Sequence, residues 1–255
     1  MSTTRRSRGG VRRGPIWAQP APGERKPRFT REQIAEVAIA IADKDGFEAV
    51  SMRRIADELG AATMTLYHYV RTKDDLLALM DDAIMASVLV PAASLPTDWR
   101  AALQLIAMQS YRAFMRHPWA LEALRGARFG PNGFRHFEQS LAAVANAPFD
   151  LQHRFDALGI VDDYVFGHVF RLAEAMQQRE LADGKPLKST IKFAEQMMAT
   201  GDFPHVEALL GDGDSHGAWA KISRFLNDAG RFLRGLDVIL DGLEARFTQP
   251  RTRTR

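Results

Sequence analysis

The sequence has 255 residues, of which 46% are hydrophobic and 25% charged, a composition typical of a globular chain long enough to bury a full core. No apolar run approaches the roughly 18–20 residues of a membrane span, and the start lacks the apolar segment of a secretory signal. The absence of cysteine excludes disulfides and thiolate metal sites and is compatible with the cytoplasm, where we expect this protein. A net charge of +3 does not by itself indicate a nucleic-acid partner.

Basic residues gather at the two ends of the chain. Up to Arg31 there are nine Lys or Arg residues against one Glu, and the last ten residues hold four Arg and no acidic residue. Residues 1–28 are also rich in Gly and Pro, which predicts a disordered basic arm, and residues 249–255 form a basic tail. An arm beside a DNA-binding unit can add phosphate contacts, but it can equally be a solvating leader. The apolar pair Ile16 and Trp17 is an exception that could dock on the folded body.

A capping box opens the first predicted helix. The Thr30 hydroxyl and the Gln33 side chain can each bond the backbone amide of the other residue. Apolar residues then recur on one face through Lys44, and Asp45 with Gly46 ends the helix. We expect this helix to support the next two in a three-helix head.

Two short predicted helices around a glycine follow. Ser51 can cap the first, and Gly60 stands where a left-handed C-cap residue is required. The second begins at Thr63, with Leu66 and Val70 spaced to pack back against the first. This is a helix-turn-helix pattern, whose second helix can turn its outer face into a major groove of DNA. Spacing alone fits an ordinary helical hairpin with a solvated face equally well.

The residues from Arg28 to Leu79 follow a denser pattern than spacing alone. They include Ile55-Ala56, Leu59-Gly60, Ala61, Thr65-Leu66-Tyr67, His68-Tyr69, Lys73 and Leu76-Leu77. This pattern closely resembles the DNA-binding segment of the tetracycline-repressor (TetR) family, and the remainder of the chain resembles the family in helical layout. The resemblance implies a homodimeric transcriptional regulator, a repressor released from a double-stranded DNA operator by a small ligand. An activator remains open, as does a helical small-molecule-binding protein or enzyme that has kept a helix-turn-helix head.

Groove geometry and this resemblance single out the residues expected to meet DNA. Arg53 is expected at a base edge, through the planar fork of its guanidinium. Groove edges and thymine methyl groups are expected to meet Thr63, Met64, Thr65 and His68. Phosphates are expected to meet Tyr67, Tyr69 and Lys73.

The chain after the head is predicted to be helical throughout. Thr72 and Asp75 predict the cap of a fourth helix through Val88, expected to link a head over residues 29–73 to a second domain over residues 74–248. The resemblance implies that this helix is the lever that transmits ligand binding to the DNA-binding head, in response to a movement of residues 126–133. Further helices are predicted at 98–116, 118–124, 132–144, 150–180, 188–200, 204–210 and 219–247. No strand pattern occurs, so the fold class is all-α.

Two of these helices are long enough to present a second apolar face. The segments 150–180 and 219–247 need something further to cover that face. In the resembled family the corresponding helices pair in a four-helix homodimer bundle, whereas packing within one chain is the alternative. One short recognition helix reads few bases and two-fold symmetry doubles the site, so we expect a homodimer.

The second domain is rich in aromatic and methionine residues at positions predicted to look inward. They are Met108, Tyr111, Phe114, Trp119, Phe129, Phe134, Phe137, Tyr164, Phe166, His168, Phe170 and Met176. A plain helical core explains most of them, but buried Tyr and His side chains need polar partners. The resemblance implies a pocket for a small apolar or aromatic ligand. The residues proposed to line it are Met108, Tyr111, Phe114, Trp119, Phe137, Tyr164 and His168.

Nothing in the sequence indicates catalysis, a cofactor or a metal site. Asp212, Asp214 and His216 faintly resemble a calcium loop, but Ser223 stands where the bidentate Glu is required. The motifs of zinc proteases, serine hydrolases and P-loop nucleotide-binding proteins are missing. We therefore expect a binding protein and not an enzyme.

Overall fold

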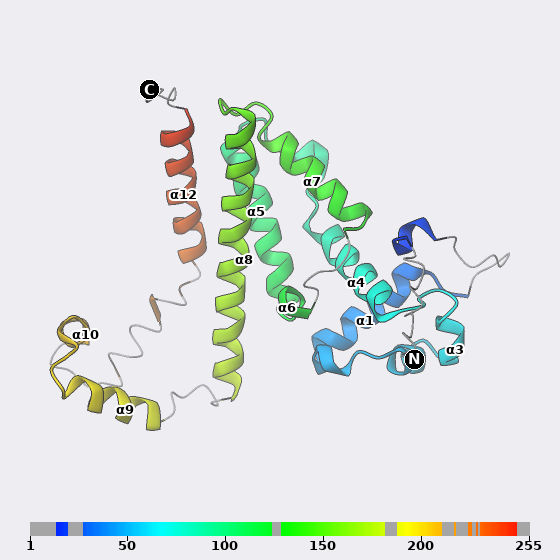
Figure 1. The fold of residues 1–255 in the computed structure, drawn as a ribbon, viewed down its shortest axis with the longest axis horizontal. Helices are drawn as coiled ribbons and strands as arrows, with labels where there is room; N and C mark the ends of the chain where they lie inside the picture. The colour runs from blue at the N-terminus through cyan, green and yellow to red at the C-terminus, as the bar shows by residue number, and fades with distance from the viewer. Residues whose placement is uncertain are drawn as a thin grey trace, which may run out of the picture. The chain divides into compact units, whose positions relative to one another are not determined.

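The computed structural model describes residues 14–19, 28–123, 129–181, 188–210, 217, 224–225, 228 and 230–248. The helices are α1 (Arg31–Asp45), α2 (Met52–Glu58), α3 (Thr63–Leu66), α4 (Lys73–Val88), α5 (Trp99–Arg116), α6 (Ala120–Ala123), α7 (Pro131–Ala143), α8 (Leu151–Leu181), α9 (Lys188–Met198), α10 (Pro204–Leu210) and α12 (Arg231–Phe247) (Figure 1). Short 3-10 turns are η1 (Ile16–Ala18), η2 (Phe47–Ala49) and η3 (Ala92–Ser94). These ranges contain no strand, and the predicted all-α fold is confirmed.

Contacts within the chain define two compact units. Unit 1 contains the described residues up to Leu89 together with Trp119–Glu138, and unit 2 contains Val90–Pro118 and the described residues from Gln139 onward. The predicted boundary after residue 73 is therefore not where the contacts divide. The reason is that α4 packs against α1 and stays with the head.

Capping interactions set the start of each helix in the head. The Thr30 hydroxyl accepts a hydrogen bond from the Gln33 amide (3.1 Å), and the Gln33 side chain accepts one from the Thr30 amide (2.9 Å). The hydroxyls of Ser51 and Thr72 likewise accept from the amide three residues later, at 3.2 and 3.0 Å. All three predicted caps are confirmed, because each hydroxyl satisfies an amide that has no partner within its helix.

The core of the head fixes the position of the short helix α3. Only four residues of α3 are helical, too few to be stable without tertiary packing. The amides of Tyr69 and Val70 both donate to the Leu66 carbonyl at 2.9 Å, which tightens the turn after the helix. The side chains that hold this arrangement are fully buried: Ile34, Ala38, Ile55, Ala56, Leu66 and Val70.

Gly60 makes the turn between α2 and α3. Its φ of +60° lies in the left-handed region that only glycine adopts without steric cost. The following Ala61 amide donates to the Ala56 carbonyl (2.9 Å), so a carbonyl at the end of α2 is satisfied. The predicted left-handed C-cap is confirmed.

One helical segment is more apolar than the sequence prediction allowed. Residues Lys73–Ser94 are long and apolar enough to cross a membrane by length and composition alone. Core packing is the simpler explanation, since Leu79, Met80 and Ile84 are buried in unit 1 and the same helix carries the buried carboxylate Asp82.

Unit 2 is built on α5, α8 and α12, with α8 packed against both of the others. Asp98 and Asp150 cap α5 and α8, each accepting a hydrogen bond from the amide three residues later at 2.8 Å. The predicted helix starting at Pro118 begins instead at Ala120, and residues 219–230 lie mostly outside the described ranges. Side chains buried between these helices include Leu103, Ile106, Val161, Val165, Val169, Leu236 and Leu240.

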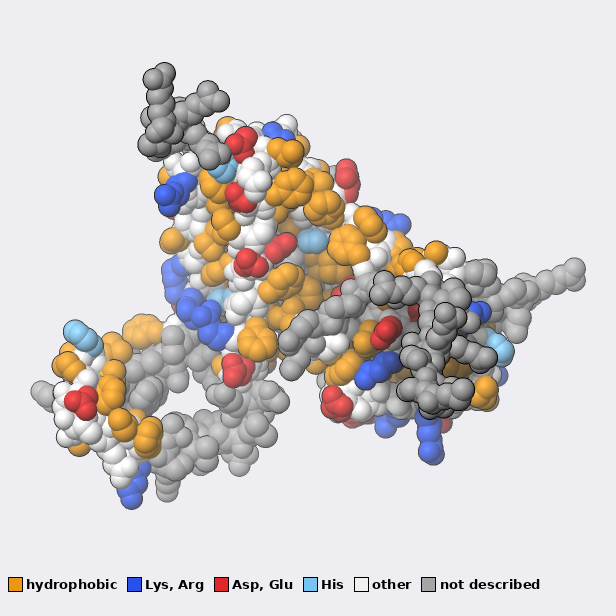
Figure 2. All heavy atoms as spheres, viewed as in Figure 1, with side chains coloured by type: hydrophobic (Ala, Val, Ile, Leu, Met, Phe, Trp, Pro, Cys, Tyr) orange, Lys and Arg blue, Asp and Glu red, His pale blue; other side chains and the backbone are white. Residues whose placement is uncertain are grey.

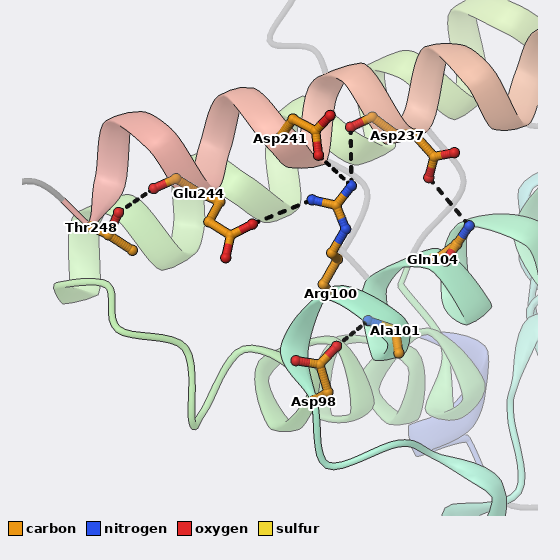
Figure 3. A network of polar contacts seen from close by, with 8 residues as sticks. All are labelled: Asp98, Arg100, Ala101, Gln104, Asp237, Asp241, Glu244 and Thr248. Carbon is orange, nitrogen blue, oxygen red and sulfur yellow. Dashed lines mark hydrogen bonds and ion pairs between the residues drawn. The ribbon is translucent and has the colours of Figure 1, made fainter.

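A polar network ties α5 to α12 (Figure 3). The Arg100 guanidinium contacts the Asp241 carboxylate at 2.5 Å and the Glu244 carboxylate at 3.5 Å, and it donates to the Asp237 carbonyl at 3.4 Å. One turn along α5, the Gln104 amide donates to the Asp237 carboxylate at 3.4 Å. These contacts fix the register of α12 on α5 beside the apolar core.

The prediction that the aromatic and methionine residues all look inward is wrong for half of them. Between 40% and 63% of the side chain is exposed at Phe129, Phe134, Phe137, Phe166, Phe170 and Met176. Helical spacing identifies an apolar stripe on a helix, but it does not show how much of that stripe a neighbouring helix buries.

Replacing Gly60 with Ala should destabilise the head by about 1 kcal/mol, because a Cβ is strained at this positive φ even though no atom lies within 4 Å of it. Gly60→Asn is the matched control, since asparagine tolerates the left-handed region better. Urea unfolding of both variants provides the measurement. Equal stability of the alanine variant and the unmodified protein would contradict the assignment.

Candidate functional site

The inner face of α3 is buried in the core of the head, so its outer face is exposed to solvent. Met64 is 72% exposed, His68 is exposed, and Thr63 and Thr65 are half-buried. Tyr67 follows the helix and is 42% exposed. These exposed side chains lie together on a surface that the buried face of α3 holds in one position. Such a surface is suited to insertion into the major groove of DNA.

The neighbouring arginines Arg53 and Arg54 have different surroundings. The Arg54 guanidinium contacts the Asp45 carboxylate (3.2 Å) and the Glu58 carboxylate (3.1 Å), which ties α2 to the end of α1. Arg53 is exposed and has no hydrogen-bond or ion-pair partner within the described part of the chain. Of the two, only Arg53 is available to an outside partner.

Lys73 is the first residue of α4 and is exposed, with its ammonium 5.8 Å from the centre of the Phe47 ring. The helix start is a weak anion site by itself, because Thr72 already accepts from one first-turn amide and the carboxylates of Asp74 and Asp75 stand in the same turn. A phosphate here would depend mainly on the Lys73 side chain.

Tyr69 is placed differently from the expectation that it meets a phosphate. Its side chain is only 4% exposed, and its ring packs edge-on against Phe29 with the ring centroids 6.4 Å apart. Alternation of exposed and buried residues is irregular in the turn after α3, so sequence spacing could not place this ring in the core. Tyr69 is therefore a core residue of the head and not part of the exposed surface around α3.

Two arginines that the sequence did not single out brace the reading head. Arg28 donates to the Gly60 carbonyl at 3.0 Å and so holds the turn of the helix-turn-helix. Arg31 donates to the Tyr69 carbonyl at 3.3 Å, just beyond α3. Their only sequence signal was the cluster of positive charge before α1, which does not reveal a carbonyl partner.

An acidic groove of about 450 Å³ lies in unit 1, between α1 and α4. Its lining includes Trp17, Ile39, Leu79, Ala83 and Asn132, and the carboxylates of Glu32, Glu36, Asp43 and Asp82. The negative charge of these carboxylates makes the groove unsuited to binding a polyanion such as DNA.

Asp82 is the polar centre of a contact between α4 and the start of α7. Its carboxylate accepts from the backbone amide (2.7 Å) and the side-chain amide (2.8 Å) of Asn132. Burial, and then the charge of Asp82, raises the pKa of the adjacent Asp81 to about 6. A Cβ on Gly130 would overlap the Asp82 carboxylate, so the backbone can approach this closely only at a glycine.

Three of the predicted ligand residues form one aromatic cluster in unit 2. Tyr111, Tyr164 and His168 surround Phe232, with ring centroids 4.4, 5.4 and 5.2 Å from the centroid of its ring. The Tyr164 hydroxyl donates to the Phe232 carbonyl at 2.9 Å. The cluster therefore joins α5, α8 and α12.

His168 has unpaired hydrogen-bonding capacity inside this cluster. It is 7% exposed, and its Nδ1 has no partner among the described residues. Burial first, and then the charges of Arg171 and Arg231, lower the pKa of His168 from its usual 6.5. The imidazole is therefore neutral at pH 7 and offers one unused polar atom in an apolar surrounding.

The other predicted ligand residues are not brought into this cluster. Phe114 packs edge-on against Phe166 (ring centroids 5.3 Å apart), Met108 is half-buried, and Phe137 is 42% exposed. Trp119 lies in unit 1, where its indole N–H donates to Asp43 at 2.7 Å.

The described residues contain no candidate metal site. The loop with Asp212, Asp214 and His216 lies outside the described residues. Among those that are described, no three His, Asp or Glu side chains come close enough to hold a metal ion.

Two family profiles match this chain. Residues 34–80 match "Bacterial regulatory proteins, tetR family", and residues 91–247 match "Tetracyclin repressor-like, C-terminal domain". The HTH-type transcriptional repressor DrrR1 of Streptomyces coeruleorubidus is 33% identical over 89% of this chain and 81% of its own length. An HTH-type transcriptional regulator of Saccharopolyspora erythraea is 34% identical over 80% of this chain and 86% of its own length.

Solved structures share the fold. Apo ActR from Streptomyces coelicolor superposes with a TM-score of 0.62 at 25% identity, covering 87% of this chain and 99% of ActR. A second structure of ActR, in complex with actinorhodin, gives 0.62 at 24% identity and 85% and 96% coverage. The sequence match over most of both units, and not the fold alone, settles the assignment: this chain belongs to the tetR family of bacterial transcriptional regulators.

Proposed function

We propose that this chain is a homodimeric transcriptional repressor that leaves its operator when a small aromatic ligand binds unit 2. The observation that carries the proposal is how α3 is anchored: Leu66 and Val70 are fully buried, whereas Met64 and Tyr67 are exposed. A four-residue helix held this firmly can present the same face to each operator it meets. We place its work in the cytoplasm, where the DNA is.

We expect a second copy of the chain to pack against the outer face of unit 2. Exposed apolar side chains recur along α8 and α12, including Phe155, Ile160, Phe166 and Val238. Figure 2 shows hydrophobic side chains reaching the surface over the helices of this unit. Two recognition helices held about 34–36 Å apart would enter successive major grooves, which one α3 cannot achieve.

The aromatic cluster supports a ligand with a flat apolar body and one polar group. Tyr111, Tyr164 and Phe232 offer ring faces and edges, and His168 Nδ1 is the unused polar atom. Desolvating an unpaired polar atom costs roughly 1–3 kcal/mol, so a ligand that pairs with Nδ1 recovers that cost. A ligand that prefers a different spacing of the recognition helices would lower DNA affinity.

The segment Trp119–Glu138 supports a route for this coupling, since it belongs to the compact unit that contains the head. Trp119 bonds Asp43 on α1 and stacks on Phe47, with ring centroids 5.7 Å apart. Asn132 bonds Asp82 on α4. A ligand-induced shift in this segment would therefore displace both α1 and α4. The effect of the ligand need not be transmitted through α4 alone.

Replacing Lys73 with Ala should weaken binding to every duplex and flatten the dependence of affinity on salt by about one unit per protomer, because one phosphate contact is lost. Fluorescence anisotropy at several salt concentrations measures the slope. Lys192→Ala, which removes an exposed lysine from α9, is the matched control. An unchanged slope for the Lys73 variant would contradict the phosphate contact.

Arg53→Ala should relax the preference at one base pair by about 1–3 kcal/mol, whereas binding to unrelated duplexes should change little. Selection from a random duplex library before and after the change gives the preference directly. Arg53→Lys keeps the charge and loses the planar fork, so it should relax the same position. If both variants select the same base pairs as the unmodified protein, Arg53 does not read a base.

His168→Ala should alter the response to ligand without altering the affinity of the free protein for operator. A panel of planar aromatic compounds, screened by thermal shift and then by release of labelled operator, provides the measurement. His153→Ala, which removes another histidine of α8, is the control. Loss of operator binding by the His168 variant alone would show that His168 is a structural core residue.

A further inference from the structure

The short segment before the head is folded onto it. Ile16 is 1% exposed, which confirms that this residue of the apolar pair docks on the folded body. The Ala18 amide donates to the Pro15 carbonyl (2.9 Å). The Gln19 amide donates to the Ile16 carbonyl (3.1 Å), and these two bonds close the turn η1. We call residues 15–19 the N-terminal strap, which belongs to unit 1.

One guanidinium joins the N-terminal strap to the end of the recognition helix. The Nη1 atom of Arg31 donates to the Ile16 carbonyl (2.9 Å) and to the Gln19 carbonyl (3.2 Å). Its Nε atom donates to the Tyr69 carbonyl (3.3 Å), in the turn that directly follows α3. The positive charge strengthens each of these bonds, and the planar fork of arginine suits several acceptors at once. The strap and the turn after α3 are therefore held by the same side chain.

A second contact joins the N-terminal strap to the start of α7. The Trp17 ring lies against the backbone of the buried Gly130, since a Cβ built on that glycine would be 2.7 Å from Trp17 Cζ2 and would also overlap the Asp82 carboxylate. Trp17 lines the acidic groove together with Asp82 and Asn132. The backbone and side-chain amides of Asn132 both donate to Asp82. The strap thus reaches the junction of α4 and α7.

Trp17 meets this junction through its ring and not through its indole N–H. The Nε1 atom is buried and has no hydrogen-bond partner among the described residues. A buried donor without a partner is destabilising, so the N–H does not explain why tryptophan suits this position. A large flat ring does, because it packs on the bare backbone of Gly130.

The two contacts give the strap more than the role of a cover. Covering an apolar patch on the head requires only the buried Ile16 side chain. The strap in addition bonds the side chain that holds the turn after α3 and packs on the start of α7, which are separate parts of unit 1. Packed side chains and hydrogen bonds in contact with one another are the physical means by which two such parts are coupled.

We propose that the N-terminal strap is a positioning element, which couples the start of α7 to the recognition helix. A movement of Gly130 displaces the Trp17 ring and the strap with it, and Arg31 passes the displacement to the Tyr69 carbonyl. The recognition helix ends at this turn, so its exposed face moves as well. The inference rests on the proposed operator binding. It differs from the route through α1 and α4, because the strap acts on the end of α3 directly.

The first test is a double-mutant cycle on the full chain, with an operator that the unmodified protein selects from random duplexes. Gly130→Ala supplies the displacement, because its Cβ has to push Trp17 aside, and Arg31→Gln releases the strap from the Tyr69 carbonyl. Each change should lower operator affinity, measured by fluorescence anisotropy. The double variant should lose at least about threefold less than the product of the single effects, because the displacement no longer reaches α3.

The matched control in this cycle is Arg28→Gln, which removes the bond to the Gly60 carbonyl (3.0 Å) at the turn before α3. This bond braces the same head without involving the strap. The effects of Arg28→Gln and Gly130→Ala should therefore multiply to within about twofold. Effects that multiply for Arg31 as they do for Arg28 would overturn the coupling.

Trp17 provides a second test that needs no added Cβ. Trp17→Ala should lower the ratio of operator affinity to affinity for an unrelated duplex at least about threefold, because α3 is no longer held in one position. Partial unfolding would lower both affinities by the same factor and leave the ratio unchanged. Trp17→Phe retains a flat ring and should restore most of the ratio.

Two outcomes would overturn the role of the Trp17 ring: an unchanged ratio in Trp17→Ala, or an equal loss in Trp17→Phe. The failure of the strap is distinct from the failure of the proposed function. An unmodified chain that selects no operator overturns the proposed function and the inference with it. A chain that selects an operator, with effects of Gly130→Ala and Arg31→Gln that simply multiply, overturns the coupling alone.

Discussion

The structure of the reading head depends on the burial of one side of a helix that is too short to exist alone. Helix α3 contributes a single turn, and the free energy that orders it comes from burying Leu66 and Val70 in a core that also contains Ile34 and Ile55. Everything polar around it serves that packing. Arg28 fixes the turn before the helix and Arg31 the turn after it, so the exposed residues are displayed in one conformation. Pre-ordering of this kind reduces the entropy lost when DNA binds.

The sequence could predict the parts of the fold that are written locally. A threonine followed three residues later by Gln or Asp predicted the caps at Thr30 and Thr72, and a serine before an apolar run predicted the cap at Ser51. A glycine after an apolar run predicted the left-handed turn at Gly60. Such signals act over one helical turn, and their physical meaning does not depend on the rest of the molecule. The pattern of the helix-turn-helix is a chain of these local signals.

What could not be predicted depends on contacts between segments far apart in the chain. Helical spacing placed Trp119 with the ligand residues, but its indole bonds Asp43 in unit 1, 76 residues earlier. The resemblance suggested that Tyr69 meets a phosphate, whereas the turn after α3 places its ring in the core. The union of Tyr111, Tyr164 and His168 around Phe232 was half foreseen, because the pocket residues were expected but the ring that joins them was not. Pairings of this kind are decided by tertiary packing, which leaves no local mark.

Phe232 has a consequence for how such a protein would respond to its signal. It is buried against Tyr111, and it belongs to the first turn of α12, whose opposite face carries the exposed Val238. A molecule that moves this ring must move the helix that a second protomer would cover. Subunit association and ligand capture would then be thermodynamically linked, each altering the other by the same factor. Dilution alone would change the apparent sensitivity to the signal, so a cell that makes few copies of the chain would set a different threshold from one that makes many.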